Sequence, residues 1–366
     1  MRGKDCIPLE DYPARRIVLI KPSSLGDIVQ TLPVLTALRY RYPQAHIAWI
    51  VNRHYEALLR GHPDLSSTIS FDREAGRESW LQTAAVYRRF FRHLRRQRFD
   101  LVIDLQGLLR SGLMAAACRA SRRVGFSSAR EGAAWFYTDV IDVGNLQTMH
   151  AVDRYWRVAE TFGAGHLQKQ FHVPIPVADQ AWATETLRGS PRPWLMLAVG
   201  ARWITKRWPV AHFGALARSA QKAFGGTVVF MGGSDEASLA RATAEHLWGH
   251  VLDLTGRTTL SQLGAVLALA DAVVANDSGP LHLAAALGRP VVAPYTCTQV
   301  RLNGPYGTET GAVEANVWCQ GSYRKRCDRL ECMAALTPGD LWPALQAILR
   351  EWRTRRQPGI GFPAHA

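Results

Sequence analysis

The sequence predicts an α/β protein built from two doubly wound, mostly parallel sheets, each covered by helices on both faces. Short apolar runs alternate with segments of helical periodicity through both halves of the 366 residues, and such alternation is typical of parallel sheets. A proline-rich stretch, 174–193, interrupts this alternation and leaves two parts of ordinary domain size. No apolar run approaches the roughly 18 residues that a membrane-spanning helix requires.

The expected organisation has six segments. They are an N-terminal extension (1–14), a first domain (15–173), a linker (174–193), a second domain (194–337), a C-terminal helix (338–356) and a tail (357–366). The C-terminal helix is amphipathic, and we expect it to pack back on the first domain.

The first domain is predicted to contain five strands, each an apolar run bounded by turn-forming residues. They span 17–20, 46–51, 67–71, 100–104 and 123–126. The segments with helical periodicity span 27–41, 55–60, 78–98, 108–119 and 150–162. The helix 78–98 has an apolar stripe, from Trp80 to Leu94, that we expect to face the core.

The second domain repeats the alternation. Its strands are predicted at 194–199, 227–231, 251–253, 272–275 and 291–293, and its helices at 209–224, 236–248, 260–269 and 280–287. We expect a cleft between the two domains, with ligand sites at the carboxyl ends of the strands.

The net charge of +14 is concentrated in the first half, where residues 1–172 carry 25 Lys and Arg against 16 Asp and Glu. The helix 78–98 contributes six arginines, among them Arg88, Arg92 and Arg95. This basic face indicates an anionic partner, although a solvated face without a partner has the same pattern. The chain has no helix-turn-helix, zinc-finger or RNP signature, so we expect no nucleic-acid partner.

Three of the six cysteines, Cys319, Cys327 and Cys332, lie close together in the sequence. Three thiols can hold a metal ion or form a disulfide, but their spacing is irregular and contains no CxxC pair. We therefore expect no metal site. The N-terminus lacks the apolar core of a signal peptide, so we expect a cytoplasmic protein.

A candidate catalytic acid follows the first strand. After the strand 17–20 comes a loop containing Ser23 and Ser24, and a helical pattern begins at Asp27. Asp27 therefore lies at the edge where open α/β sheets bind ligands. It is placed to act as a general base, and the same position also suits a simple helix cap.

The second domain has polar residues at the corresponding edge. Asp277, Ser278 and Gly279 follow the strand 272–275, and His282 lies in the next helix. Small residues at a helix N-terminus let backbone N–H groups approach an anion closely, which suits a pyrophosphate. A helix cap alone would not require this combination of residues.

Two further strand ends in this domain supply a cation and carboxylates. Lys206 follows the strand 194–199 and can neutralise a phosphate, and Asp235 or Glu236 can bind ribose hydroxyls. Neither domain has GxGxxG after its first strand, and no P-loop motif is present, which argues against a nicotinamide dehydrogenase and a P-loop NTPase. The second domain thus predicts a nucleotide-diphosphate site.

Five segments together resemble glycosyltransferase family 9, the ADP-heptose:lipopolysaccharide heptosyltransferases. They are KPSSLGDIVQTLP (21–33), DLVIDLQG (100–107), RRVGF (122–126), TKRWP (205–209) and NDSGPLHLAAALG (276–288). The resemblance covers most of the chain, in the family's order. It implies the GT-B architecture, with an acceptor-binding first domain and a nucleotide-sugar-binding second domain facing a central cleft.

The resemblance also implies a reaction, the inverting transfer of heptose from ADP-heptose to the lipopolysaccharide inner core, with no cofactor or metal required. Asp27 falls at the position of the catalytic base and Lys206 at that of the phosphate-binding lysine. The donor-binding pattern falls on Asp277, Ser278, Gly279 and His282. The ribose-binding acid falls on Glu236, with Asp235 adjacent.

The acceptor implied is an anionic glycolipid, so we expect a monomer in peripheral contact with the inner face of the membrane. The residues expected to bind this acceptor are Ser23, Ser24, Arg88, Arg92, Arg95 and Arg123. Two alternatives stay open. One is a transferase of the same fold with another nucleotide sugar or acceptor, and the other is a non-catalytic protein that binds nucleotides or polyanions.

Overall fold

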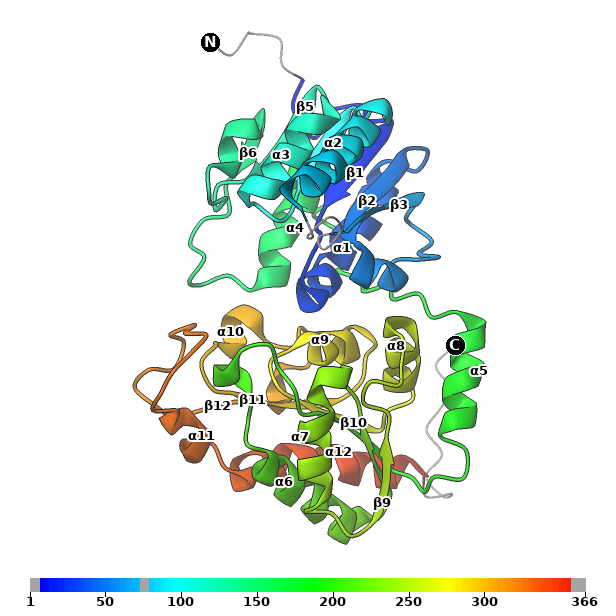
Figure 1. Ribbon diagram of the computed structural model, residues 1–366, viewed down its shortest axis with the longest axis vertical. Coiled ribbons are helices and arrows are strands. Elements are labelled where there is room, and N and C mark those ends of the chain that lie inside the picture. Colours follow the sequence, from blue (N-terminus) through cyan, green and yellow to red (C-terminus); the bar gives the residue numbers. More distant parts are fainter. Residues whose placement is uncertain (1–6, 73–78, 357–366) are drawn as a thin grey trace. The chain divides into compact units, whose positions relative to one another are not determined.

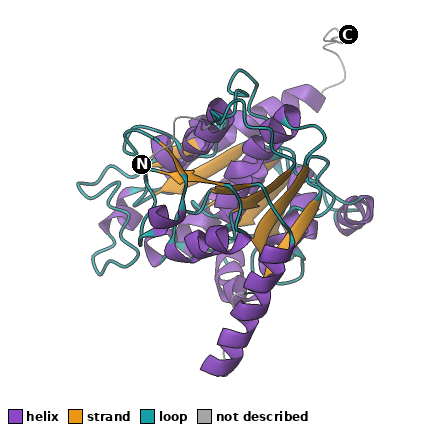
Figure 2. Cartoon of the chain, turned by 90° about the horizontal axis from the view of Figure 1, so that it is seen from above, coloured by secondary structure: helices purple, strands orange, loops and turns teal. Residues whose placement is uncertain are grey.

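The structure, a computed structural model, describes residues 7–72 and 79–356. The chain divides into two compact units, Met1–Pro176 and Val177–Ala366 (Figure 1). Each unit contains a six-stranded parallel sheet as its inner layer, with helices outside it (Figure 2). The predicted fold class is therefore confirmed. The expected tail, 357–366, and the first six residues of the expected extension lie outside the described residues.

The first sheet has the strand order β3-β2-β1-β4-β5-β6. Its strands are β1 (Arg16–Ile20), β2 (His46–Asn52), β3 (Ser67–Phe71), β4 (Leu101–Asp104), β5 (Arg122–Phe126) and β6 (Asp139–Ile141). The chain builds outwards from β1 to β3 and then returns to place β4 on the other side of β1. Such a reversal opens a crevice at the carboxyl ends of β1 and β4, where doubly wound sheets bind their ligands.

Helices cover both faces of the first sheet. They are α1 (Leu25–Arg41) and α4 (Ala151–Thr161) on one face, and α2 (Trp80–Arg96) and α3 (Leu109–Cys118) on the other. On α2, Leu94 is buried and Tyr87 and Phe91 pack against the core, as expected. Trp80 does not, since it is 77% exposed. The helix is about 25 Å long and β4 about 13 Å, so the first turns of α2 extend beyond the core.

The second sheet has the strand order β12-β11-β10-β7-β8-β9. Its strands are β7 (Trp194–Ala198), β8 (Thr227–Phe230), β9 (His250–Asp253), β10 (Ala272–Ala275), β11 (Val291–Tyr295) and β12 (Ala312–Glu314). The strands β7, β8 and β9 follow one another toward one edge of the sheet, and the chain then returns to place β10 on the other side of β7. The crevice of this unit therefore lies at the carboxyl ends of β7 and β10.

Helices also cover both faces of the second sheet. They are α6 (Val210–Phe224), α7 (Ala237–Ala244) and α12 (Pro338–Arg356) on one face, and α5 (Val177–Thr186), α8 (Leu260–Ala268) and α9 (Gly279–Ala286) on the other. The prediction that the C-terminal helix packs on the first domain is wrong. Leu341, Leu345 and Leu349 on α12 are buried in the core of the second unit, because their stripe fits against α6 and β11.

The expected linker, 174–193, is also largely wrong. It contains α5, which packs on α8, and the Ser261 hydroxyl of α8 donates a hydrogen bond to the Asp179 carboxylate of α5 over 2.5 Å. The prolines that suggested a linker flank this helix instead of interrupting it. Among the described residues, no helix combines the length and the apolar character needed to cross a bilayer.

Candidate active site

Asp27 lies in the first turn of α1, directly after the loop that follows β1. Its Oδ2 atom accepts hydrogen bonds from the Ser24 backbone N–H (3.0 Å) and from the Ser24 hydroxyl (2.6 Å). Asp27 therefore satisfies one of the helix's free N-terminal donors, as a capping residue does. Capping does not bury the carboxylate, because 38% of the side chain is exposed.

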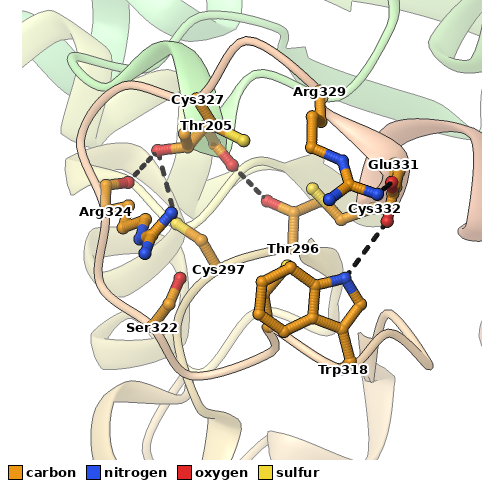
Figure 3. Close-up of a pocket in the computed structure, with 11 residues that line it drawn as sticks. Thr205, Thr296, Cys297, Trp318, Ser322, Arg324, Cys327, Arg329, Glu331 and Cys332 are labelled. Atoms are coloured by element: carbon orange, nitrogen blue, oxygen red, sulfur yellow. Dashed lines mark hydrogen bonds and ion pairs between the residues drawn. The ribbon is translucent and has the colours of Figure 1, made fainter.

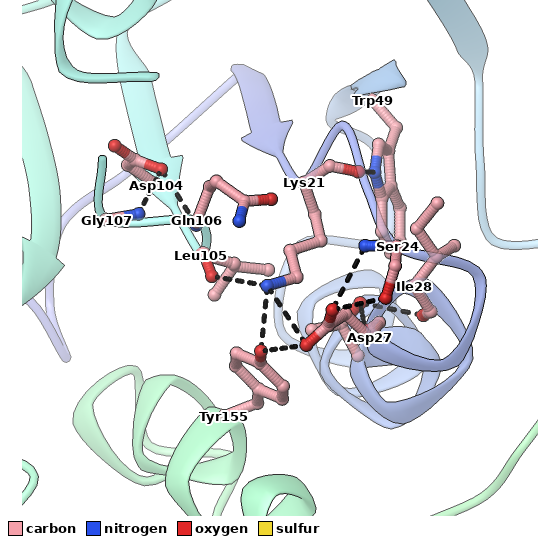
Figure 4. Close-up of polar contacts among 11 residues, drawn as sticks. Lys21, Ser24, Asp27, Ile28, Trp49, Asp104, Leu105, Gln106, Gly107 and Tyr155 are labelled. Carbon is pink, nitrogen blue, oxygen red and sulfur yellow. Dashed lines mark hydrogen bonds and ion pairs between the residues drawn. The ribbon is translucent and has the colours of Figure 1, made fainter. Parts of the chain in front are cut away.

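The other carboxylate oxygen of Asp27 faces a buried lysine and a tyrosine (Figure 4). Lys21 Nζ lies 3.7 Å from Asp27 Oδ1, and Tyr155 donates a hydrogen bond to the same oxygen over 3.2 Å. Lys21 Nζ also donates to the Tyr155 hydroxyl (2.8 Å) and to the carbonyl oxygen of Leu105 (3.2 Å). Lys21 thus joins β1, α4 and the loop after β4 beneath Asp27.

This arrangement sets the charge of the carboxyl group. Burial disfavours the charged form of Asp27, but the positive charge of Lys21 and the hydrogen bonds from Ser24 and Tyr155 outweigh it and lower the pKa of Asp27 to about 2. Burial likewise opposes the charge of Lys21, yet Asp27 and Tyr155 raise the pKa of the lysine. Both groups are therefore charged at neutral pH.

A carboxylate has about four positions at which it can accept a hydrogen bond. In Asp27, two positions on Oδ2 are occupied by Ser24 and one on Oδ1 by Tyr155. Among the described residues, one acceptor position on Oδ1 is left without a hydrogen bond, and 38% of the side chain is exposed. Asp27 is thus a capping residue whose carboxylate keeps one free acceptor position.

The loop after β4 lies on the other side of the crevice. Asp104 is fully buried and accepts hydrogen bonds from the Tyr137 hydroxyl (2.7 Å) and from the backbone N–H groups of Gln106 (2.9 Å) and Gly107 (3.2 Å). Burial raises its pKa. The side-chain oxygen of Gln106 is buried without a hydrogen-bond partner among the described residues, and the side chain points toward Lys21 (Figure 4).

The residues expected to bind the acceptor fall in different places. Ser24 is committed to holding Asp27, and Ser23 is half-buried in the same loop. Arg88, Arg92 and Arg95 are exposed on one stripe of α2.

Arg123 is not at this site. It is the second residue of β5, near the amino end of a strand parallel to β1, whereas Asp27 follows the carboxyl end of β1. Its guanidinium donates to the carbonyl oxygens of Phe136 (2.7 Å) and Ala120 (2.8 Å). We correct the acceptor role of Arg123 to a structural one.

In the second unit, Asn276 links the carboxyl ends of β7 and β10 by hydrogen bonds. It is fully buried after β10, and its Nδ2 atom donates to the carbonyl oxygens of Val199 (2.8 Å) and Gly200 (3.3 Å). Its Oδ1 atom accepts the backbone N–H of Trp208 (3.0 Å). The loop that carries Lys206 is therefore held against the end of β10.

The next residue, Asp277, is the centre of a buried ionic cluster. Its Oδ2 atom accepts hydrogen bonds from Lys206 Nζ (2.5 Å) and from the Thr298 hydroxyl (2.6 Å), and its Oδ1 atom lies 3.3 Å from His282 Nε2. Burial raises the pKa of Asp277, but the hydrogen bond from His282 and the charge of Lys206 outweigh it and hold this pKa well below its usual range. Lys206, Asp277 and His282, three of the residues predicted to bind the nucleotide sugar, thus lie together.

Ser278 and Gly279 lie where α9 begins. Ser278 is the N-cap residue, but its hydroxyl makes no capping hydrogen bond and is buried without a partner among the described residues. The first backbone N–H groups of a helix have no intrahelical acceptor, and the helix dipole adds partial positive charge there. These donors and Lys206 make this strand end suitable for a diphosphate.

Glu236 reaches the same edge of the sheet from the loop after β8. Its Oε2 atom accepts the backbone N–H of Gly233 (3.1 Å), and a Cβ atom built on Gly200 would lie only 1.8 Å from Oε1. Only glycine at position 200 leaves room for this carboxylate. Asp235 is exposed, so Glu236 is the better placed of the two acids. Burial raises the pKa of Glu236.

Four residues of these sites were not identified from the sequence, namely Lys21, Tyr155, Asn276 and Thr298. Lys21 had a usable signal, since a lysine directly after an apolar strand must find a partner. Tyr155 and Thr298 had none, because their contacts join segments far apart in the chain. No group of three or more His, Cys, Asp or Glu side chains among residues 7–72 and 79–356 is arranged to hold a metal ion.

Known proteins resemble this chain along most of its length. The model of glycosyltransferase family 9 (heptosyltransferase) matches residues 87–333. Lipopolysaccharide heptosyltransferase 1 of Pseudomonas aeruginosa is 30% identical over 320 residues, which cover 85% of this chain and 87% of that protein.

Two solved structures share the fold. The glycosyltransferase family 9 structure from Veillonella parvula has a TM-score of 0.81 at 23% identity, covering 92% of this chain and 98% of that one. Heptosyltransferase WaaC of E. coli, solved with ADP, has a TM-score of 0.72 at 25% identity, covering 91% of this chain and 99% of that one. The two sheets, the family match and the curated relative agree, and the chain is a glycosyltransferase of the GT-B fold that belongs to glycosyltransferase family 9.

Proposed function

We propose that this enzyme transfers heptose from ADP-heptose to the lipopolysaccharide inner core, with inversion at the anomeric carbon. The observation that carries the proposal is the pair of strand-end sites. The first unit holds an ionised, partly exposed Asp27, and the second holds Lys206, Asp277 and the start of α9. Curated relatives named lipopolysaccharide heptosyltransferases and a related structure solved with ADP support this donor and acceptor.

In the proposed reaction, Asp27 accepts the proton of the acceptor hydroxyl as its oxygen bonds to the anomeric carbon. A carboxylate with a pKa of about 2 is a weak base toward a free alcohol. The hydroxyl becomes strongly acidic as the new C–O bond forms, so the proton moves late and a weak base suffices. General-base catalysis of this kind contributes roughly 10²–10⁴-fold.

The leaving group is the diphosphate of the nucleotide. Lys206, the Ser278 hydroxyl and the first N–H groups of α9 supply charge and donors that are already in position when negative charge develops on it. Glu236 is proposed to bind the ribose hydroxyls. The single displacement needs no cofactor and no metal, since the charge on the leaving group is met by these side chains and amides.

The acceptor is proposed to be an anionic glycolipid presented at the inner face of the membrane. On α2, Arg88, Arg92 and Arg95 are exposed on one stripe, and Trp80 and Leu81 are exposed at the start of the same helix. Basic and apolar side chains on one helix suit contact with an anionic lipid surface. We propose a monomeric, peripheral enzyme, because the residues of each strand-end site all come from one unit of the same chain.

The decisive experiment is Asp27→Asn assayed with ADP-heptose and a lipid-linked inner-core acceptor. The amide oxygen can still accept the Ser24 N–H, so the variant should fold and bind ADP normally while turnover falls by at least about 100-fold. Near-normal turnover would refute the base. NMR of the product gives its anomeric configuration, and retention would refute the single displacement.

The nucleotide and sugar require a separate measurement. Thermal shifts with ADP-, UDP- and GDP-sugars should be largest for ADP-heptose, because only ligands that bind the folded state raise its melting temperature. A larger shift with another nucleotide sugar would favour the second candidate, a transferase of the same fold with a different donor.

A further inference from the structure

A cavity of about 100 Å³ in the second unit is lined by four cysteines (Figure 3). They are Cys297 after β11, Cys319 and Cys327 in the following loops, and Cys332 in the short helix α11 (Glu331–Ala335). The five cysteines among the described residues are all free thiols, so four of the five gather in one place. Neither the proposed donor site nor the proposed base uses them.

The surroundings of Cys327 favour its thiolate form. Its sulfur accepts hydrogen bonds from the backbone N–H groups of Leu330 and Arg329, and Arg324 adds positive charge nearby, which together lower the pKa of Cys327. It directly follows the basic sequence Arg324-Lys325-Arg326 and is only partly buried. A thiolate that is stabilised by positive charge and reachable from solvent is the reactive form of cysteine.

Cys332 lies among the other three thiols. Burial raises its pKa to about 11, and the nearby sulfurs of Cys319, Cys297 and Cys327 add to this shift. Cys332 is therefore a buried, protonated thiol with other sulfurs around it. It follows Cys327 by five positions, and both side chains line the same cavity.

Two chemistries are open to such a cluster, namely metal binding and thiol oxidation. The sulfurs of the described residues are not arranged as a metal-ligand group. The charges in the cavity lining also give no net attraction for a dication, because they are Arg324, Arg329 and the Glu331 carboxylate that pairs with Arg329. Positive charge near a thiol stabilises its thiolate, which favours oxidation.

We propose that Cys327 and Cys332 form a redox-sensitive pair that closes to a disulfide with a low-molecular-weight disulfide as the oxidant. The Cys327 thiolate attacks one sulfur of that oxidant, which gives a mixed disulfide and releases one small thiolate. Cys332 then gives up its proton to solvent and attacks Cys327, which releases the second small thiol. Two protein thiols are oxidised and one small disulfide is reduced.

The cavity is connected to the donor site through Thr205, which immediately precedes Lys206. The Thr205 hydroxyl donates to the carbonyl oxygen of Arg324 (2.5 Å), and its own carbonyl oxygen accepts the Thr296 hydroxyl (2.5 Å). Joining Cys327 to Cys332 moves the 324–332 loop and pulls on this link. Oxidation therefore weakens binding of the nucleotide diphosphate, an effect that rests on the proposed function of Lys206.

The test treats the purified full chain with glutathione disulfide and maps its peptides without reduction. Trypsin cleaves after Arg326 and after Arg329, so Cys327 and Cys332 fall on separate peptides that only a disulfide can join. We expect this linked pair, and its loss on reduction. No disulfide, a disulfide between other cysteines, or a metal ion that copurifies with the thiols and is lost in Cys332→Ser would overturn the proposal.

The same samples are titrated with ADP. The oxidised chain should bind ADP about tenfold more weakly than the reduced chain, whereas Cys327→Ser should bind ADP equally under both conditions. Cys118→Ser, at a buried thiol of the first unit, is the matched control and should respond as wild type. Unchanged affinity on oxidation would overturn the coupling. If the reduced chain binds no ADP at all, the proposed donor function fails, while the peptide map still decides the thiol pair.

Discussion

Lys21 and Asp27 form an ion pair in which the lysine is shielded from solvent and the carboxylate reaches it. The ammonium nitrogen of Lys21 lies 3.7 Å from Asp27 Oδ1, with the lysine side chain 3% exposed and the aspartate side chain 38% exposed. Lys21 cannot approach an acceptor from this position. We propose that it acts on the reaction through the charge and orientation of Asp27.

Replacing Lys21 with Met should move the acidic limb of the pH profile upward. In the wild type the pKa of Asp27 is about 2, so the base stays ionised and active until the pH falls that low. Without the lysine charge, burial becomes the dominant effect and the pKa rises, so activity is lost at a higher pH as the pH falls. The measurement is kcat/KM from about pH 4 to 8.

Lys21→Arg is the control for this experiment, because it keeps the positive charge and should keep the acidic limb low. Circular dichroism and the cooperativity of thermal unfolding of the whole chain show whether Lys21→Met has folded. A folded Lys21→Met enzyme with the wild-type pH profile would contradict the role of Lys21.

Tyr155→Phe removes a hydroxyl that donates to Asp27 and accepts from Lys21, while keeping the ring. Hydrogen bonds to charged groups contribute about 1.5–3 kcal/mol, so kcat should fall by about tenfold or more. The KM for the nucleotide sugar should not change, because Tyr155 belongs to the first unit. An increase in donor KM with unchanged kcat would count against this assignment.

Lys206→Met should abolish measurable donor binding, but it also leaves Asp277 buried with less compensation. Removing one partner of a buried ion pair costs about 3–5 kcal/mol of stability. The double variant Lys206→Met with Asp277→Asn removes both charges and should recover much of that stability without recovering ADP affinity. Thermal denaturation and ADP titration measure the two effects separately. Restored ADP binding in the double variant would refute the phosphate role of Lys206.

The arginine stripe on α2 predicts binding to anionic lipid surfaces. Changing Arg88, Arg92 and Arg95 to Gln should weaken binding to anionic vesicles and reduce its dependence on salt, since each basic residue near such a surface contributes about 1 kcal/mol. A matched control changes Arg241, Arg257 and Arg350, which are exposed in the second unit. Equal losses in the two triple variants would mean that net charge, not the α2 stripe, governs the binding.

Much of the fold could be predicted because alternation and helical periodicity are local properties of the chain. Ten of the twelve strands among the described residues, and the helices that begin beside Asp27 and Asp277, follow from short windows of sequence. The predictions were wrong where the packing of an element depends on residues far away in the sequence. The amphipathic α12 has a clear apolar stripe, but nothing in that stripe indicates which core it enters.

The chemistry at each strand end could be predicted from neighbouring residues alone. A strand, a loop of small residues and a helix place Asp27, or Ser278, at the carboxyl edge of a parallel sheet wherever the sheet lies. The same short segment supplies the carboxylate of Asp27 in the first unit, or the hydroxyl and backbone N–H groups around Ser278 in the second. These features depend on residues within a few positions of one another, so no long-range contact is needed to read them.

Contacts between distant parts of the chain set how those groups are charged and held. Tyr155 reaches Asp27 across 128 positions, Thr298 meets Asp277 from another strand end, and Arg123 is turned away at the opposite edge of its sheet. The order of the strands brings such residues together or keeps them apart, and that order is set by the packing of the whole unit. A pKa depends on every charge and donor around a group, so it is decided at the same level.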